Sequence, residues 1–350
     1  MTPNVAEGAQ VPVDTKVSVT ATQGTLVAVT MTYTDPKAGP QTVQGTLAPD
    51  AATWTANSLL EPGMTYQIAM QGQSTAGVST SRTATFTTQA LSLKQQVFAT
   101  IASGGTVGVA MPVVVRFDVP VTDRASFQKH MRVTATPATE GSWNWLSSTE
   151  AHWRPRELWK PGTKVSIEID INSIPAGNGR YGQKSVSGSM TIARSVILKA
   201  DLASHQMTVV IDGAPARTIP ITGGKPGFET RSGKKVVMEK FSTLKMDANS
   251  VGIEPGSPEY YNIPDVRYAM RETDSGEFIH AAPWSVGSQG KRNVSHGCVG
   301  MSTDNADWLM ANTQVGDPVV YTGSSRALEN GNGWTDWNIT YEQFKKGSAL

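Results

Sequence analysis

Apolar and polar residues alternate along most of this chain, in short runs that end at Gly, Pro, Asp or Asn. Residues 26–33 and 113–117 are typical runs. Alternation with a period of two places successive side chains on opposite faces of a strand, whereas a helix needs a period near 3.6. Helical periodicity is nearly absent before residue 300. The pattern therefore predicts a mainly β fold.

The chain also repeats itself at a spacing of 99 residues. Five positions recur in one register: Trp54, Leu59, Pro62, Gly63 and Ile68 return as Trp153, Leu158, Pro161, Gly162 and Ile167. In each unit a strand ends near the Trp, Pro-Gly closes a polar turn, and an alternating strand follows. A period of this size suits an immunoglobulin-like β-sandwich. We predict two such sandwiches, roughly residues 1–90 and 91–194, with both Trp residues as core anchors.

A third β-rich region begins near Ser195, and we place a domain at residues 195–323. Residues 196–200 and 206–211 flank a polar turn and lead to Asp212-Gly213, a dipeptide typical of hairpins. Residues 222–227 are rich in glycine but lack the Lys-Ser/Thr ending of a phosphate-binding loop, and no helical pattern follows. We interpret them as a plain loop.

The remainder of the chain is less regular. Residues 247–265 are rich in Gly, Pro, Ser and Asn but carry two tyrosines, which suits either a lid over a groove or a plain connection. Ser302 is a suitable cap for a helix of about ten residues with one apolar face. Residues 324–350 form a Trp-rich extension that is too aromatic for a solvated tail, so we expect it to pack on the body.

Composition limits the classes of function. The net charge of the 350 residues is +1, from 30 basic and 29 acidic side chains that are mixed along the sequence, so we expect no nucleic-acid partner. One cysteine cannot form an internal disulfide, which leaves the redox compartment open. No apolar run approaches the roughly 20 residues of a membrane span. The first residues lack an export signal, so any signal lies outside this sequence.

The strongest chemical feature is that single cysteine. Cys298 lies in Ser295-His296-Gly297-Cys298-Val299, fourteen residues after Phe278-Ile279-His280. A free thiol is only a few per cent ionised at neutral pH, so a nucleophilic thiol needs a base beside it. His280 is the better candidate, because it lies on a separate predicted strand that could pair alongside. Gly297 would let the chain turn and bring backbone N–H groups toward an oxyanion.

Two alternatives remain open on these residues alone. Cys298 could be a small buried hydrophobic residue with incidental histidines nearby. His280, His296 and Cys298 could also bind a metal, although His-x-Cys with one distant His is poor spacing for zinc and no fourth ligand is evident.

The spacing of His280 from the Ser-His-Gly-Cys-Val segment resembles the signature of the L,D-transpeptidase catalytic domain, the family that cross-links peptidoglycan through a cysteine. The resemblance extends to Trp284-Ser285-Val286 and Gln289-Gly290. Two immunoglobulin-like modules before this domain, and a Trp-rich extension after it, resemble the mycobacterial members. The chain departs from the family at Gly300, where Asn is usual. Losing that amide removes potential hydrogen bonds and adds backbone freedom, so the rigidity of the loop, and with it the rate or inhibitor susceptibility, is open at this position.

The resemblance implies acyl transfer. Cys298 would attack the carbonyl of the L-centre of diaminopimelate in a donor tetrapeptide stem, D-alanine would leave, and the side-chain amine of an acceptor stem would resolve the thioester. His280 would act as the base, and the N–H groups of His296, Gly297 and Cys298 are candidates for the oxyanion hole. Further implied substrate-site residues are Tyr260, Tyr261, Trp284, Ser295 and Gly300.

The same resemblance implies peptidoglycan stem peptides and carbapenems as partners, and no metal or organic cofactor. It also implies export to the cell envelope, with a membrane anchor outside this sequence. Two other functions remain as alternatives. Water could resolve the thioester, which would make the protein an L,D-carboxypeptidase, or Gly300 could have weakened catalysis and left a peptidoglycan-binding scaffold.

Overall fold

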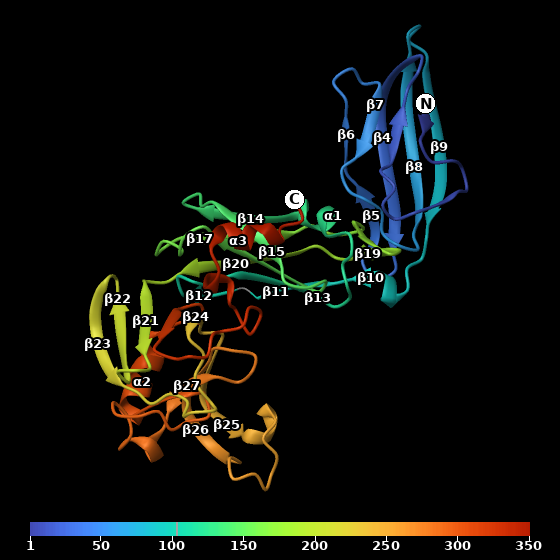
Figure 1. The fold of residues 1–350 in the computed structure, drawn as a ribbon. Helices are drawn as coiled ribbons and strands as arrows, with labels where there is room; N and C mark the ends of the chain where they lie inside the picture. Colours follow the sequence, from blue (N-terminus) through green and yellow to red (C-terminus); the bar gives the residue numbers. More distant parts are fainter. Residues whose placement is uncertain (103) are drawn as a thin grey trace.

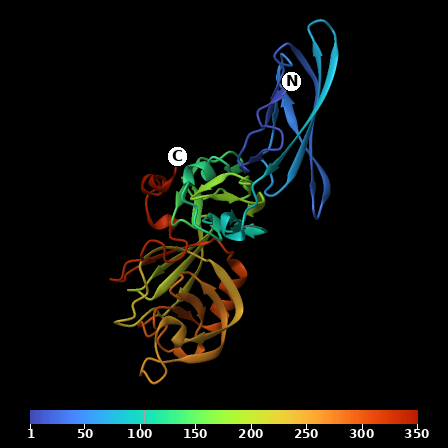
Figure 2. The ribbon, with the colours of Figure 1, turned by 90° about the vertical axis from the view of Figure 1, so that its right-hand side faces the viewer.

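The computed structural model describes residues 1–102 and 104–350. Figures 1 and 2 show an elongated molecule in which three β-rich bodies follow one another in chain order. The first body projects from one end of the second, where Asn172 and Ser173 bond to Glu61 and Leu60, and the C-terminal segment returns to the second body. The prediction of a mainly β fold with two sandwiches before a third domain is confirmed.

The first body consists of two sheets, with strand orders β1-β3-β7-β6 and β2-β9-β8-β4-β5. Strand β8 alternates exposed and buried residues along its length, as the sequence pattern requires. The strands are β1 (Thr2–Pro3), β2 (Gln10–Val11), β3 (Ser18–Thr20), β4 (Gly24–Asp35), β5 (Gly39–Val43), β6 (Gly45–Leu47), β7 (Thr53–Ala56), β8 (Thr65–Ser74) and β9 (Ser79–Thr88).

The second body has the sheets β11-β13-β16-β15 and β12-β20-β17-β14, with a small third sheet, β10-β19-β18. Its elements are η1 (Leu93–Gln95), β10 (Gln96–Val97), β11 (Ala99–Ala102), β12 (Thr106–Val107), β13 (Val113–Phe117), α1 (Arg124–Gln128), β14 (Met131–Thr136), β15 (Gly141–Trp145), β16 (Glu150–Pro155), β17 (Lys164–Ile169), β18 (Pro175–Gly177), β19 (Arg180–Gly182) and β20 (Val186–Ile192). Helix α1 was not predicted, because five residues are too few to show a helical period.

The repeated Trp residues occupy matching places in the two sandwiches. Trp54 and Trp153 are both buried, and each ring covers a glycine on the neighbouring strand. A Cβ atom built on Gly45 would lie 2.1 Å from the ring of Trp54, and one on Gly141 would lie 2.1 Å from that of Trp153. The glycines therefore make room for the anchors. The 99-residue repeat did not reveal this match, because the glycine precedes its Trp by 9 residues in the first sandwich and by 12 in the second.

The third body packs two sheets against each other, β23-β22-β21-β29-β24 and β25-β26-β27-β28. Asp212 and Gly213 have φ angles of 50° and 85° in the β22–β23 turn, which confirms the predicted hairpin. The strands are β21 (Val196–Asp201), β22 (Gln206–Ile211), β23 (Ala214–Pro220), β24 (Gly233–Val236), β25 (Glu239–Asp247), β26 (Asn262–Arg271), β27 (Phe278–Ala281), β28 (Val299–Met301) and β29 (Pro318–Thr322).

Helix α2 (Thr303–Asn312) follows β28, and its N-terminus is capped by Ser302, whose hydroxyl accepts the N–H of Asn305. The predicted helix and cap are thus confirmed. The remaining short helices are η2 (Ala248–Val251), η3 (Pro283–Ser285), η4 (Asp336–Asn338), α3 (Tyr341–Phe344) and η5 (Lys345–Gly347). No helix in the described part of the chain has the length and apolar character needed to cross a bilayer.

The C-terminal extension packs into the second sandwich, next to the catalytic candidate domain (Figure 1). Trp334 and Trp337 are buried in the core of that sandwich, and the Nε1 of Trp337 donates to the carbonyl of Ala110 at 2.7 Å. Asp336 accepts from Nδ1 of His152 at 2.9 Å, and Nε2 of His152 bonds to Glu150 at 2.8 Å. Both apolar and ionic contacts therefore hold the extension on the second sandwich.

The His152 cluster predicts a pH-dependent stability. Burial alone would lower the pKa of His152, but the carboxylates of Asp336 and Glu150 outweigh it and raise that pKa to about 9. Because the folded-state pKa is raised, the stabilisation is present below the ordinary pKa and is lost as pH rises through about 9. We expect the wild type to lose about 2–3 kcal/mol more than Asp336→Asn between pH 7 and 10. Urea unfolding at both pH values measures this difference, and equal losses would contradict it.

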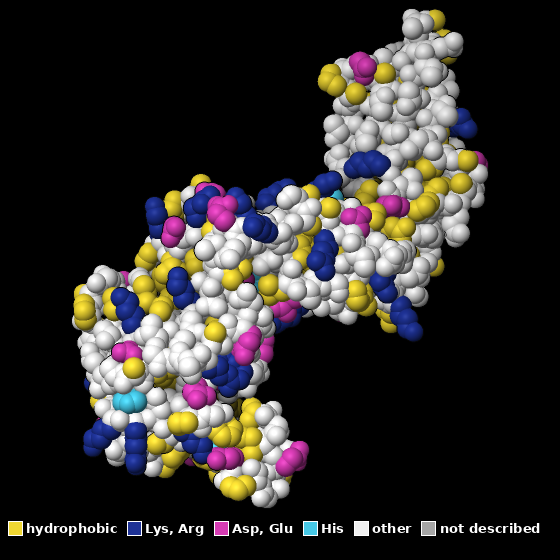
Figure 3. All heavy atoms as spheres, in the orientation of Figure 1, with side chains coloured by type: hydrophobic (Ala, Val, Ile, Leu, Met, Phe, Trp, Pro, Cys, Tyr) yellow, Lys and Arg dark blue, Asp and Glu magenta, His cyan; other side chains and the backbone are white. Residues whose placement is uncertain are grey.

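Charged side chains of both signs are interspersed on the face shown in Figure 3, and few lie on the visible face of the first sandwich. That face shows no continuous basic surface.

Candidate active site

Two neighbouring strands place the cysteine and a histidine on one sheet face. Strands β27 and β28 run parallel, with Ile279 opposite Val299 and His280 opposite Gly300. Ile279 and Val299 point into the domain core. By alternation, Cys298 and His280 lie on the other face, diagonally across the strand pair. The apolar pattern thus orients both groups toward the same side.

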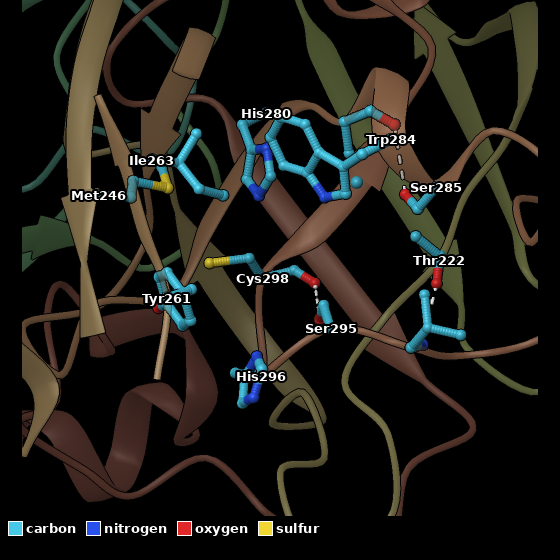
Figure 4. A pocket seen from close by; sticks show the side chains of 13 residues that line it. Thr222, Met246, Tyr261, Ile263, His280, Trp284, Ser285, Ser295, His296 and Cys298 are labelled. Atoms are coloured by element: carbon cyan, nitrogen blue, oxygen red, sulfur yellow. Dashed lines mark hydrogen bonds between the residues drawn. The ribbon is translucent and has the colours of Figure 1, made fainter. Parts of the chain in front are cut away.

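That face is the floor of a cavity of about 290 Å³ (Figure 4). The cavity is lined by Thr222, Met246, Tyr261, Ile263, His280, Ala282, Trp284, Ser285, Val294, Ser295, His296, Cys298 and Gly300. The lining includes most of the site residues expected from the sequence. Gly297 is buried behind it, and Tyr260 lies outside it, where its hydroxyl accepts from the side-chain amide of Asn262 at 3.3 Å.

His280 is held as a neutral base. Its Nδ1 lies 2.8 Å from the carbonyl oxygen of Ala281, and because a carbonyl can only accept, Nδ1 carries the hydrogen. Nε2 then keeps a free lone pair. Burial lowers the pKa of His280 below its ordinary value, which favours this neutral form. The ring stacks on Trp284, with centroids 5.9 Å apart.

The surroundings of Cys298 favour the neutral thiol. It remains partly accessible, and its Sγ donates to the carbonyl of Gly276 at 3.7 Å. Burial raises the pKa of the thiol to about 12, against the smaller opposing effect of the Phe278 amide. Figure 4 shows Sγ directed to the side of Tyr261 and Met246. The hydrogen bond from the thiol to the carbonyl of Gly276 must break before His280 can accept the thiol proton.

The segment before Cys298 is a tightly bonded turn. Gly297 has a φ of 123°, which disfavours residues with a side chain. Its carbonyl accepts from Thr230 at 2.7 Å, and its N–H donates to the hydroxyl of Ser295 at 3.1 Å. That hydroxyl donates to the carbonyl of Cys298 at 2.6 Å. Because the N–H of Gly297 is engaged here, those of His296 and Cys298 are the remaining candidates for an oxyanion hole.

His296 faces a different partner from His280. Its Nε2 bonds to Glu259 at 2.6 Å, and its ring packs on Phe228 and Tyr261, with centroids 4.8 and 5.1 Å away. Each histidine therefore has its own hydrogen-bond partner. This arrangement does not favour the alternative of a shared metal site.

The glycine-rich residues 222–227, interpreted from the sequence as a plain loop, are part of the site. The N–H of Ser295 donates to Gly223 at 3.0 Å, and that of Lys225 donates to Ser295 at 2.9 Å. This segment therefore supports the turn before Cys298. Sequence reasoning also missed Met246 and Ile263, which form the wall opposite Trp284. Their apolar alternation in two strands gave no sign of which face covers a cavity.

Comparison with known proteins decides the family. The model of the L,D-transpeptidase catalytic domain matches residues 195–320, and that of a bacterial Ig domain matches residues 8–175. L,D-transpeptidase 2 of Mycobacterium tuberculosis is 35% identical over 351 residues, which cover 100% of this chain and 85% of that protein. The chain belongs to the L,D-transpeptidase family.

Solved structures agree with this assignment. An LD transpeptidase in complex with imipenem is 36% identical, with a TM-score of 0.56 over 64% of this chain and 97% of that one. L,D-transpeptidase 3 from Mycobacterium tuberculosis, in complex with a faropenem-derived adduct, is 30% identical, with a TM-score of 0.53 over 64% and 97%. The predicted family and fold are confirmed, and the protein is a cysteine-dependent transpeptidase.

Gly300 of this transpeptidase is firmly held. Its N–H and carbonyl both pair with Thr222, each at 2.9 Å, and it lies in strand β28 beside His280. The rigidity that the sequence left open at this position is provided by pairing on both sides of the backbone, with His280 and with Thr222. A Cβ atom at this position would lie 2.8 Å from that of Ala282. The glycine therefore allows β28 to lie close to Ala282, the residue that follows β27.

We expect Gly300→Ala to lower the free energy of unfolding by about 1–3 kcal/mol, because the added methyl group overpacks this contact. Chemical denaturation measures the loss. Adding Ala282→Gly to the same variant removes the opposing methyl group and is expected to restore part of the stability. Unchanged stability in the single variant would show that the strands separate at no cost.

A buried ionic network lies beneath the catalytic turn of the transpeptidase. Glu277 bonds to Lys235 at 2.6 Å and to Arg231 at 2.9 Å, and all three side chains are largely buried. Glu272 accepts from the hydroxyl of Tyr321 at 2.9 Å, and burial raises its pKa to about 7. A Cβ atom built on Gly297 would lie 3.5 Å from Oε1 of Glu277, so this network packs against the turn.

Proposed function

We propose that the protein cross-links peptidoglycan stems through an acyl-enzyme on Cys298, with His280 as the proton carrier. One observation carries the proposal: a thiol and a neutral imidazole lie on one sheet face and line one cavity. The donor is a tetrapeptide stem that ends in D-alanine, attacked at the L-centre carbonyl of its third residue, diaminopimelate.

In the first step, Nε2 of His280 takes the thiol proton as Sγ forms a bond to the donor carbonyl carbon. The N–H groups of His296 and Cys298 would stabilise the negative oxygen. When the carbonyl re-forms, the carbon–nitrogen bond to D-alanine breaks. His280 returns its proton to the departing amine, which leaves a thioester on Cys298.

In the second step, the side-chain amine of an acceptor stem attacks the thioester carbon. His280 accepts a proton from this amine, the carbon–sulfur bond breaks, and the proton returns to Sγ. If water attacks instead, the stem is hydrolysed and the net reaction is that of an L,D-carboxypeptidase. Ser295 and Gly300 line the same cavity, and Tyr261 and Trp284 form two of its walls, which suits them to contact the stems.

We further propose that carbapenems acylate Cys298, since the solved relatives include complexes with imipenem and with a faropenem-derived adduct. The thiol would open the strained lactam ring as it opens the peptide bond. We also place the protein in the cell envelope, where its proposed substrate is found, with the two sandwiches as a spacer.

The test is incubation with a disaccharide tetrapeptide that contains diaminopimelate, followed by mass analysis of the products. The proposal expects free D-alanine and a cross-linked dimer. Free D-alanine with tripeptide alone would favour the carboxypeptidase. Intact stems in the presence of folded protein would overturn the proposal.

The resting state makes a further prediction. Because the pKa of Cys298 is about 12, we expect the rate of alkylation by iodoacetamide to rise about tenfold per pH unit across the neutral range. Mass spectrometry of the labelled protein at several pH values measures this rate. A rate that stays constant between about pH 6 and 9 would instead indicate a preformed thiolate–imidazolium pair.

A further inference from the structure

A charged cluster lies at the rim of the cavity, on the side of His296. Glu259 belongs to the loop between η2 and β26, residues 252–261, which we call the rim loop. Its Oε2 contacts Nζ of Lys225 on the glycine-rich segment and Nε2 of His296 in the catalytic turn. Figure 4 shows His296 at the end of the cavity opposite His280 and Trp284. Three separate segments thus meet at one carboxylate.

This cluster keeps unused hydrogen-bonding capacity. The side chains of Lys225 and Glu259 are 31% and 35% exposed. Both recorded bonds to the Glu259 carboxylate use Oε2, so Oε1 has no partner among the described residues. The ammonium of Lys225 lies 5.4 Å from the centroid of the Phe228 ring, and among the described residues it makes one hydrogen bond through a group that carries three donors. The pair can therefore accept one bond and donate two more without breaking its own contact.

The cavity itself offers nothing that matches a charged substrate group. Its lining residues include no Asp, Glu, Lys or Arg. The third residue of the proposed donor, however, ends in a carbon that bears both an ammonium and a carboxylate. Burying either charge without a partner is costly. The ionic pair joined to the cavity through His296 carries the two complementary charges side by side.

We propose that Lys225 and Glu259 form a recognition subsite for the zwitterionic end of the donor's third residue. Lys225 binds the carboxylate, and Oε1 of Glu259 binds the ammonium. His296 holds Oε2 of Glu259 and so orients the pair toward the cavity. The proposal rests on the proposed function, and it makes these two residues determinants of substrate choice, while Cys298 and His280 carry the chemistry.

The experiment measures kcat/KM for D-alanine release from three tetrapeptides. One carries the free zwitterion, one has the distal carboxylate converted to an amide, and one has the distal amine acetylated. In the wild type, each modification is expected to reduce kcat/KM about tenfold, as for the loss of one charge-assisted hydrogen bond. In Lys225→Gln, converting the carboxylate to an amide is expected to cause no further reduction in kcat/KM. In Glu259→Gln, acetylating the amine is expected to cause no further reduction.

Two further variants serve as controls. Lys225→Arg keeps the positive charge and is expected to keep the preference for the carboxylate. Lys199→Gln removes an exposed lysine from β21, away from the cavity, and is expected to behave as the wild type. Thermal unfolding checks that every variant is folded.

The outcomes separate the two proposals. If the wild type releases no D-alanine from any donor, the proposed function fails and this subsite with it. If the wild type turns over all three donors equally well, the function stands and the subsite is overturned. If Lys225→Gln slows all three donors by the same factor, the pair only fastens the rim loop, and the recognition role is overturned.

Discussion

The His280→Gln variant is expected to release D-alanine about 10² to 10⁴ times more slowly than the wild type, the range typical of a lost general base. The carbonyl of Ala281 fixes the hydrogen on Nδ1 of His280 and leaves Nε2 free to accept a proton. The other imidazole in the cavity lining is that of His296. The side chain of His296 is engaged by Glu259. Initial rates with the tetrapeptide donor measure the effect.

A pH profile separates this role from a structural one. The base must be unprotonated, so wild-type activity is lost as pH falls through the pKa of His280, which burial places below its ordinary value. In His280→Gln the rate is expected to fall, and the activity that remains is expected to show no such loss at acidic pH. A variant that remained within threefold of the wild type, with the limb intact, would assign the proton transfer to another group.

The second large effect is on stability. Glu277→Leu is expected to lower the free energy of unfolding by about 3–5 kcal/mol, because it leaves the buried ammonium of Lys235 without its partner at 2.6 Å. Burying an unpaired charge costs far more than the pair contributes. Urea denaturation measures the loss.

The matched control for this prediction removes the charges of the Glu277–Lys235 pair and leaves Arg231 with its second partner, Glu329. Glu277→Leu combined with Lys235→Met places apolar groups of similar size in the same space, and we expect it to recover most of the stability. If the single variant were as stable as the wild type, Lys235 would have to be solvated or neutral in the folded protein. If the double variant were no better than the single one, the loss would come from Arg231, which also loses its bond to Glu277, or from the change of shape, and not from Lys235.

The sequence predicted those parts of the site that depend on local pattern. Alternation in residues 278–281 and 298–301 is enough to place His280 and Cys298 on one face, because core residues occupy the positions between them. The cap at Ser302 is equally local. Such features depend on neighbours within a few residues, which the sequence displays directly.

The parts that escaped prediction depend on pairs of residues far apart in the chain. The contacts of Glu259 with Lys225 and His296 span 34 and 37 residues, and that of His152 with Asp336 spans 184. Charged residues in loops show no period, and many are simply solvated, so their partners emerge only when the sheets bring them together. The same holds for Gly300, whose close approach to Ala282 depends on strand pairing.

The central claim is that the acyl group passes through Cys298, and the most direct measurement is the mass of the protein itself. The tetrapeptide donor is added without an acceptor, the reaction is quenched in acid, and the peptide containing residue 298 is analysed. The account predicts a thioester that adds the mass of the stem minus D-alanine, on the only cysteine in the chain, and no adduct in Cys298→Ala. Cross-linked product from Cys298→Ala, or an adduct on any other residue, would contradict it.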